Sequence, residues 1–487
     1  MTSKTTLFLH ATIITVNPSR EILHDGYLLV CDTRIAALGP CPAPPDITTP
    51  ATKTLDCTGK IIIPGLINTH AHLVQSLLRG LAEDLPLHNW LCDAIWPLES
   101  SYADRDGYHA ARLTIAEMLK TGTTCFLDPM VTYRAGWENV CEAVMEMGIR
   151  GCLSKLVKFP ETNRQLSITD PRDKDLLSMS IPSLLSAHET HHNPSKNLHV
   201  WAAAGTPRGA PMPLYRALGE TCADHGISIT MHCAEAPKDK DIYHDVYGCS
   251  AMEFIRDAKL CPQRIPHAGS DGDGKEKKSH SLVLAHMVNL DLETDLPLLK
   301  ETGTAVAHNP TSNLKLASGV AAIPEMLAPD MGITVGLGTD GAPCSNHYDM
   351  VQEMHLAAIL HKGMRRDAGA LGAQGALEMA TIQGARALGL EGEVGSLEVG
   401  KRADLVVLDP YGRGGMGAAP WGWKGEDWKS GGAGAVTTVV HGCTGRDVDV
   451  TMVDGEILVE GGVLVNGGRE REREIEGRER GPLFEYG

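Results

Sequence analysis

The chain has 487 residues, of which 43% are hydrophobic and 22% charged, the ordinary balance of a globular protein. Its formal net charge of −17 opposes the attraction to phosphate backbones that drives nucleic-acid binding, so we expect no nucleic-acid partner. No run approaches the ~20 apolar residues that cross a bilayer, so we expect no membrane segment.

Length, cysteines and the first residues bear on domain number and compartment. At roughly 100–200 residues per domain the chain is long enough for two to four domains, although a barrel of about 250 residues can be one. The 13 cysteines are scattered without a CxxC pair, which is typical of reduced thiols. The first residues alternate like a strand and contain no secretory h-region. We therefore expect a cytoplasmic protein and leave a homo-oligomer open.

Both ends of the chain have the sequence pattern of short strands separated by turns. LFLHATIITV and YLLVCDTRIAAL stand near the start, and ADLVVLD, AVTTVVHG and VTMVDGEILVEGGVLV stand near the end. We predict a small β-sandwich domain built from residues 1–63 and 396–466. The alternating charges of 467–487 predict a solvated extension, and 268–281 predicts a polar loop.

The centre, residues 64–395, alternates between apolar runs and helical patterns. Six runs turn polar where they end: IIIPGLINTHAH, TTCFLDP, ISITMHCAE, LVLAHMV, GTAVAHNP and ITVGLGTDGA. Helices are expected at 106–122 and 374–390. Such runs are typical of strands buried on both faces of a parallel sheet. The α/β pattern favours a (β/α)₈ TIM-like barrel; a doubly wound sheet is the alternative, but no GxGxxG follows a strand.

Histidines and an aspartate stand where several of these runs end. His70 and His72 are two residues apart, so both imidazoles can face one side at a strand end. His232, His286 and Asp340 end three further runs, at the face where barrel enzymes place catalytic groups. Imidazole and carboxylate are the ligands of a catalytic Zn²⁺ or similar ion that keeps an open position for water.

Glu235 lies three residues after His232, just past a predicted strand end. A carboxylate there can reach over the attacking water and the substrate, and hydrolysis of a C–N bond needs a group that moves protons. The alternative is an ordinary acidic residue in the first turn of a helix.

Taken in order, several motifs resemble one family: PGLINTHAH, SLLRGLAEDLPLHNWL, HCAE, LAH, AHNPTSNLKLASG and GLGTDGA. From about residue 60 to 410 the chain resembles the amidohydrolase superfamily. The most similar branch is that of the 5′-methylthioadenosine/S-adenosylhomocysteine deaminases, with guanine deaminases and triazine hydrolases as relatives.

The resemblance implies a role for each strand-end residue. The metal ligands would be His70, His72, His232 and Asp340. Asp340 would also take a proton from the attacking water, Glu235 would relay it to a ring nitrogen, and His286 would hydrogen-bond the oxygen that is added. Nothing resembles the carboxylated lysine of two-metal relatives, so we expect one divalent ion, zinc first, with iron or manganese as alternatives.

The resemblance also implies residues that contact the substrate. Glu99 stands where the adenosine-type relatives bind ribose hydroxyls, and Lys155 stands about where they have an arginine. Trp90 is expected to line the pocket or to pack a loop, and His308 to shape the site. Residues 204–208, Ala-Gly-Thr-Pro-Arg, replace a Gly-Pro-His segment of those relatives. The loss of this histidine predicts poor activity on S-adenosylhomocysteine.

The expected reaction is hydrolytic deamination of a small nitrogen heterocycle, in which a metal-activated water attacks the amino-bearing carbon. Release of another group, such as chloride or an alkylamine, or opening of a cyclic amide, would use the same centre. A third alternative is a catalytically silent scaffold, although such relatives usually lose ligands and this chain keeps the set.

Overall fold

The computed structural model describes residues 4–45, 51–159, 176–207, 210–262, 279–412 and 433–465. The predicted extension 467–487 and most of the predicted loop 268–281 lie outside these ranges. Among the helices within them, none is long and apolar enough to span a membrane.

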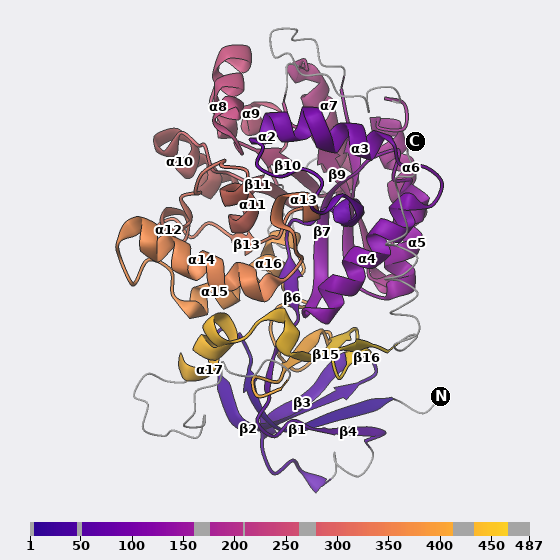
Figure 1. Ribbon diagram of the computed structural model, residues 1–487, viewed down its shortest axis with the longest axis vertical. Helices are drawn as coiled ribbons and strands as arrows, with labels where there is room; N and C mark the ends of the chain where they lie inside the picture. The colour runs from indigo at the N-terminus through magenta and orange to yellow at the C-terminus, as the bar shows by residue number, and fades with distance from the viewer. Residues whose placement is uncertain are drawn as a thin grey trace, which may run out of the picture.

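A parallel barrel forms the larger part of the molecule (Figure 1). Within the described ranges its sheet has eight strands, which neighbour one another in chain order from β6 to β13. The backbone N–H of Thr69, just after β6, donates to the carbonyl of Leu337 in β13 at 2.8 Å, so the sheet nearly closes on itself. The predicted α/β barrel is confirmed. The strands are β6 (Leu66–Asn68), β7 (Thr123–Val131), β8 (Arg150–Val157), β9 (Leu198–Ala204), β10 (Ile229–Cys233), β11 (Leu282–His286), β12 (Ala305–His308) and β13 (Val335–Leu337).

Two barrel strands, β8 and β9, are not among the six predicted runs. All eight residues of β8 are buried, although Arg150, Ser154 and Lys155 interrupt its apolar sequence. Polar residues can occupy a buried strand when neighbouring elements supply their partners. That information is not contained in the local pattern.

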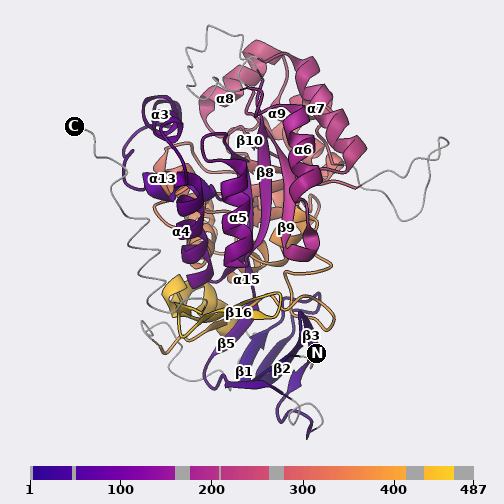
Figure 2. The same ribbon diagram turned by 90° about the vertical axis from the view of Figure 1, so that its right-hand side faces the viewer.

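Helices surround the barrel and follow most of its strands (Figure 2). The helix expected at 106–122 is α4, Asp106–Lys120. The one expected at 374–390 is divided into two helices. The carbonyl of Ala380 accepts a 2.8 Å hydrogen bond from the N–H of Ile67 in β6, so it does not accept the hydrogen bond that would continue the helix. The longer surrounding helices are α4, α5 (Trp137–Met147), α6 (Ile181–His191), α7 (Met212–His225), α9 (Ala251–Asp257), α10 (Leu292–Thr302), α14 (Met350–Arg365), α15 (Ala373–Met379) and α16 (Ile382–Leu388).

A second sheet, which we call sheet A, is built from both ends of the chain. The indigo amino-terminal and yellow carboxyl-terminal strands lie together beside the barrel (Figures 1 and 2). They join where β5 pairs antiparallel with β14. The domain limits given above stay a prediction. The strands are β1 (Thr5–Ile14), β2 (Ile22–Cys31), β3 (Arg34–Pro40), β4 (Lys53–Asp56), β5 (Ile61–Pro64), β14 (Leu405–Leu408), β15 (Val448–Val453), β16 (Glu456–Glu460) and β17 (Val463–Leu464).

The strand expected at AVTTVVHG is wrong. Residues 433–442 form the helical turns α17 (Ala433–Thr437) and η7 (Thr438–Gly442). The buried side chains of Val439 and Val440 pack in the core cluster that also holds Met354 of α14. The β-branched composition favours a strand, but burial against helices decides the conformation.

The connection between the two sheets orients the barrel. Only Gly65 separates β5 of sheet A from β6 of the barrel. The amino ends of the barrel strands therefore face sheet A, and their carboxyl ends face away from it (Figure 1). Residues that follow the strands gather at the far end of the molecule.

Candidate metal centre and active site

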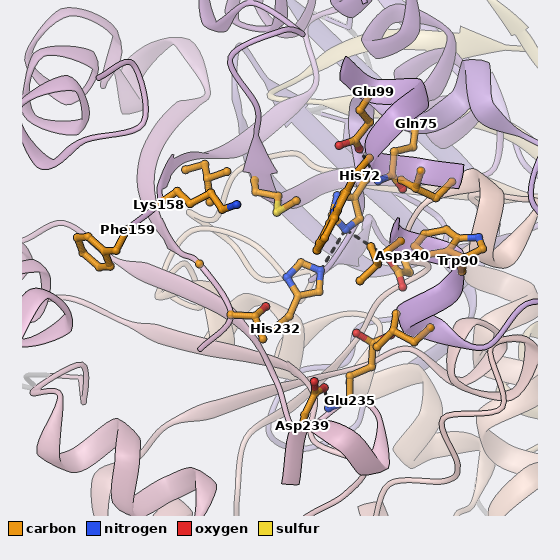
Figure 3. Close-up of a pocket in the computed structure, with 18 of the residues that line it drawn as sticks. His72, Gln75, Trp90, Glu99, Lys158, Phe159, His232, Glu235, Asp239 and Asp340 are labelled. Carbon is orange, nitrogen blue, oxygen red and sulfur yellow. Dashed lines mark hydrogen bonds and ion pairs between the residues drawn. The ribbon is translucent and has the colours of Figure 1, made fainter. Parts of the chain in front are cut away.

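The predicted ligands come from the carboxyl ends of three strands. His70 and His72 follow β6, His232 is the next-to-last residue of β10, and Asp340 follows β13. The Asp340 Oδ1 atom is 3.4 Å from Nε2 of His70 and 3.3 Å from Nε2 of His72. The Nε2 atoms of His72 and His232 are 3.2 Å apart, as Figure 3 shows. The four side chains predicted to bind a metal ion do lie together.

These separations suit a tetrahedral ion. Two ligand atoms at Zn–N or Zn–O distances of 2.0–2.2 Å lie about 3.3–3.6 Å apart in a tetrahedron. A fifth donor, His286 at the end of β11, belongs to the same group: ligand atoms of His70, His232, His286 and Asp340 all lie within 4.8 Å of one another. The centre therefore contains four imidazoles and one carboxylate.

Burial keeps three of these imidazoles neutral, the form that binds metal. It lowers the pKa of His70 to about 4, lowers that of His232 well below its usual range, and lowers that of His286. Burial also opposes the charge of Asp340, but the neighbouring imidazoles of His70 and His72 hold the pKa of this carboxyl well below its usual range. For His72, burial also acts to lower the pKa, but the Asp340 carboxylate beside it outweighs burial and raises the pKa. An anionic carboxylate beside three neutral imidazoles is a donor set for a divalent cation.

Ring nitrogens in this group need a partner. Both nitrogens of His70 and Nε2 of His286 are buried, and within the described ranges none of them makes a hydrogen bond. A buried polar atom without a partner costs about 1–3 kcal/mol. A bound cation would satisfy these lone pairs, so the residues present fit a metal ion.

Unusual backbone conformations turn two of these side chains into the centre. Asp340 has φ +64° and His286 has φ +75°. Along β11, Leu284 packs in the core between barrel and helices whereas Val283 and Ala285 belong to a different cluster. Alternation alone would place His286 on the side of Leu284, away from the centre. Its positive φ reverses this, and strain of this kind is typical of functional sites.

Two short helices position Asp340 and His286. Within α11 (Pro310–Lys315), the hydroxyl of Ser312 donates to Oδ2 of Asp340 at 2.6 Å. Oδ1 of Asp340 accepts from the N–H of Gly341, which precedes α13 (Ala342–Ser345), at 2.8 Å. The Nδ1 atom of His286 is 2.8 Å from Oδ1 of Asn313. That bond makes Nδ1 the donor and leaves Nε2 as the lone pair facing the centre.

Glu235 lies at the edge of the metal group. Its Oε2 atom is 3.6 Å from Nε2 of His286, and its side chain is buried beside the centre (Figure 3). The residue comes two positions after β10 ends, and therefore leans toward the pocket from beyond the strand. Its role as a proton shuttle stays a prediction.

A pocket opens above the centre, and two predicted substrate residues line it. Glu99 lies in α3 (Trp96–Ser100), and Trp90 begins the π-helical turn η2 (Trp90–Ile95). Both are buried, and Oε1 of Glu99 accepts a 2.8 Å hydrogen bond from Nε2 of Gln75. The pocket also contains Gly205 and Thr206 of the segment that departs from the expected Gly-Pro-His.

The other two predicted substrate residues, Lys155 and His308, are not among those that line the pocket in the described ranges. The ammonium of Lys155 lies 5.4 Å from the ring of Trp137 in α5, because Lys155 and Leu156 point to opposite faces of β8. The Nε2 atom of His308 lies 3.2 Å from that of His361 in α14. Both assignments are corrected: these side chains contact the outer helices.

Other residues of the site were not predicted. Lys158 and Phe159 follow β8 and line the pocket (Figure 3). Alternation along the strand places Lys158 on the same face as Leu156, which also lines the pocket. Asp128 of β7 accepts hydrogen bonds from the N–H groups of Leu73 at 3.0 Å and Met130 at 2.9 Å. Burial raises the pKa of Asp128 to about 6. In the second run, TTCFLDP, Asp128 stands where the apolar residues end, and this position could have identified it from the sequence.

Comparisons with known proteins identify the family of this chain. The profile of the amidohydrolase family matches residues 61–458. The chain is 32% identical over 461 residues to the 5-methylthioadenosine/S-adenosylhomocysteine deaminase of Acetivibrio thermocellus, covering 93% of this chain and 94% of the relative. It is also 32% identical over 462 residues to the 5′-deoxyadenosine deaminase of Methanobrevibacter smithii, covering 94% of each.

A solved structure has the same architecture. The adenosine deaminase from Xanthomonas campestris, which has bound zinc, superposes with a TM-score of 0.79 at 25% identity over 98% of both chains. The similarity extends over sheet A as well as the barrel.

Proposed function

This chain belongs to the amidohydrolase family, and we propose from its site that it is a metal-dependent deaminase of a purine-like heterocycle. The observation that carries the proposal is the convergence of His70, His72, His232 and Asp340 beneath a pocket whose rim holds Glu235. The two relatives at 32% identity, named as deaminases of adenosine-type compounds, support the same reaction.

We assign the metal ion to His70, His72, His232 and Asp340. The donor atoms of the pairs His72–His232, His72–Asp340 and His70–Asp340 are separated by 3.2 to 3.4 Å. Zinc is the ion we expect, because imidazole and carboxylate suit it and the similar adenosine deaminase has bound zinc. When bound, such an ion lowers the pKa of a water molecule to about 7 and so supplies a nucleophile at neutral pH. One ion per chain is expected.

The protein's own groups move the protons. Oδ1 or Oδ2 of Asp340 accepts a proton from the attacking water, and Glu235 delivers a proton to the ring nitrogen next to the attacked carbon. This nitrogen must be protonated as the carbon becomes tetrahedral, because the added charge is otherwise unstabilised. Nε2 of His286, 3.6 Å from Oε2 of Glu235, carries a lone pair that can accept a hydrogen bond from the hydroxyl group that is added. A C–O bond forms, the second proton of the water passes to the amino group through Asp340, the C–N bond breaks and ammonia leaves.

The pocket binds the rest of the substrate. Trp90 and Trp96 offer apolar surface to a flat heterocycle, and the carboxylate of Glu99 can accept hydrogen bonds from hydroxyl groups. Gln75 holds that carboxylate by its 2.8 Å hydrogen bond. This wall suits a small molecule with an aromatic ring and a polar substituent.

A screen for ammonia release tests the function. Purified protein is incubated with purines, adenosine-type nucleosides, pterins and triazines, and ammonia is measured. We expect ammonia from at least one amino-purine compound, with S-adenosylhomocysteine giving a lower kcat/KM than another member of the panel. Release of chloride or an alkylamine without ammonia would favour the alternative hydrolase, and no product from any compound would favour the silent scaffold.

Removal of the metal tests the centre directly. Elemental analysis should find about one divalent ion per chain, and a strong chelator should abolish activity, because the attacking water then keeps its ordinary pKa. Zn²⁺, Mn²⁺ or Fe²⁺ should restore it. An active preparation that contains no metal would contradict the assignment.

A further inference from the structure

The turn that carries Glu235 is held by two side chains that do not take part in the proposed chemistry. Asp239 lies in α8 (Pro237–Ile242), and its buried Oδ2 atom accepts hydrogen bonds from the N–H groups of Glu235 and Ala236, both at 3.0 Å. From the loop after β11, Nδ2 of Asn289 donates to the carbonyl of Glu235 at 2.7 Å. The N–H and the C=O of Glu235 are therefore both bound by side chains.

The same turn is strained and is fixed from a third direction. Ala234 has φ +48°, a left-handed conformation that a residue with a side chain adopts only when its surroundings enforce it. Its carbonyl accepts from the backbone N–H groups of Val288 at 3.0 Å and Asn289 at 2.8 Å. The loop after β11 thus holds the turn in the conformation that directs Glu235 toward the centre.

Asp239 also contacts the wall of the pocket. Its Oδ1 atom lies 3.5 Å from Nε2 of His88 in α2 (Leu87–Asn89). That short helix leads directly into η2 and α3, which contribute Trp90 and Glu99 to the pocket. One carboxylate therefore contacts both the turn of the proton shuttle and the segment that surrounds the substrate.

We propose that Asp239 and Asn289 are positioning residues that set the catalytic geometry of Glu235, an inference that rests on the proposed function. A general acid–base group must lie within hydrogen-bond reach of the proton it transfers, and a displacement of about 1 Å can cost about 10²-fold in rate. Without Asp239, two N–H groups of the turn lose their acceptor and the strained Ala234 can relax.

The competing explanation is that Asp239 serves only as the amino-terminal cap of α8, since it occupies the third position of that helix. A cap would affect folding but not a specific kinetic step. A positioning residue acts through Glu235, so its effect on kcat must disappear when Glu235 cannot transfer a proton.

The test combines substitutions in the full-length, metal-loaded protein. Asp239→Ala and Asn289→Ala should each lower kcat by about 10²-fold, with KM within a few-fold of normal and the metal content unchanged. Asp239→Asn keeps an acceptor oxygen and should recover part of kcat. Asp241→Ala, an exposed carboxylate on the same helix, is the matched control and should leave both constants unchanged.

The decisive measurement is Asp239→Ala in the Glu235→Gln background, where it should change kcat by no more than a few-fold. A full additional loss in that background, loss of the metal, or a fully active Asp239→Ala protein would overturn the inference. If Asp239→Ala does not fold, Asp239→Asn and Asn289→Ala decide by the same comparison. Wild-type protein that releases no ammonia would overturn the proposed function, and the inference with it.

Discussion

At the scale of single residues, the proposed roles divide into metal ligands, of which Asp340 also accepts a proton, and two groups, Glu235 and His286, that act without binding the ion. His72, His232 and Asp340 have donor atoms 3.2 to 3.3 Å from a neighbour in the group. Glu235 and His286 are 3.6 Å apart at its edge. Substitution of residues in the two sets should therefore have different consequences.

We expect Glu235→Gln to lower kcat by about 10²–10⁴, the usual contribution of a general acid–base group, because glutamine keeps the shape but cannot transfer the proton. Metal content should stay near one ion per chain, and KM should change little if Glu235 acts mainly in the transition state. Steady-state kinetics and elemental analysis of the same preparation check this.

Asp340→Asn and His72→Ala provide the contrast, since both should lose metal and activity together. His286→Ala tests the fifth donor: we expect it to keep the metal and lose kcat. Loss of the ion from Glu235→Gln, or its retention in Asp340→Asn, would contradict the division into two sets.

Glu353 predicts a pH dependence of stability. It is fully buried in α14, where its Oε2 atom accepts from the N–H of Thr311 at 3.3 Å, and burial raises its pKa from 4.5 to about 8. Between these pH values the folded protein binds a proton that the unfolded chain has released, so this residue's contribution to stability falls as the pH rises. Glu353→Gln should remove that component.

Urea unfolding at about pH 5 and about pH 8.5 checks the prediction, because most of the difference in Glu353 protonation between the folded and unfolded chain falls between these two pH values. The wild-type midpoint should fall more between the two pH values than the midpoint of Glu353→Gln. Midpoints that move in parallel would show that Glu353 is charged in the folded protein or does not influence stability.

At the scale of elements, β8 and the residues after it place two lysines on opposite faces. Lys158 lines the pocket, and Lys155 lies against Trp137 of α5. Hydrogen bonds to charged groups contribute about 1.5–3 kcal/mol. Lys158→Ala should therefore raise KM about tenfold or more for a substrate that contacts the ammonium.

Lys155→Ala is the matched control within the same segment. It should leave KM and kcat unchanged and, because Lys155 is buried, lower stability by about 2 kcal/mol through loss of the contact with Trp137. Steady-state kinetics of Lys158→Ala and Lys155→Ala on the best substrate of the panel show which of the two lysines contacts the substrate. An increase of KM in Lys155→Ala alone would show that the arrangement of the strand is wrong.

At the scale of the whole molecule, a buried ion pair joins the barrel to sheet A. Arg150 at the start of β8 donates from Nε at 2.9 Å and Nη2 at 3.0 Å to the two carboxylate oxygens of Asp404, next to β14. Oδ1 of Asp404 also accepts from the N–H of Asp454 at 2.8 Å. Both charged side chains are buried, so each depends on the other.

We expect Asp404→Ala to lower the free energy of unfolding by about 3–5 kcal/mol, because the buried Arg150 guanidinium loses its two hydrogen bonds to a carboxylate and is left with the more distant Asp454, at 3.7 Å, as a counter-charge. The control is Glu142→Ala, which removes an exposed pair with Arg105 and should cost no more than about 1 kcal/mol. Denaturant midpoints measure both. Equal effects would mean that the buried pair does not hold the two sheets together.

Much of the centre could be predicted from local sequence. Apolar runs that end in His232, His286 or Asp340 identify strand ends, and the carboxyl ends of parallel strands meet on one face of a barrel. The HxH of His70 and His72 adds two donors on the same side. No knowledge of the neighbouring strands is needed for this step, because burial of the runs and the common direction of the strands bring their ends together.

The tertiary structure alone decided which way the remaining side chains point. His286 and His308 both end a strand, yet His286 turns into the centre and His308 contacts His361 of α14. The difference lies in the φ of +75° at His286, which no apolar pattern encodes. Residues 433–442 are helical for a similar reason, since contacts with α14 and the core outweigh a local preference for strand. Side-chain direction and partner choice depend on segments distant in the chain, so they follow from packing and not from sequence spacing.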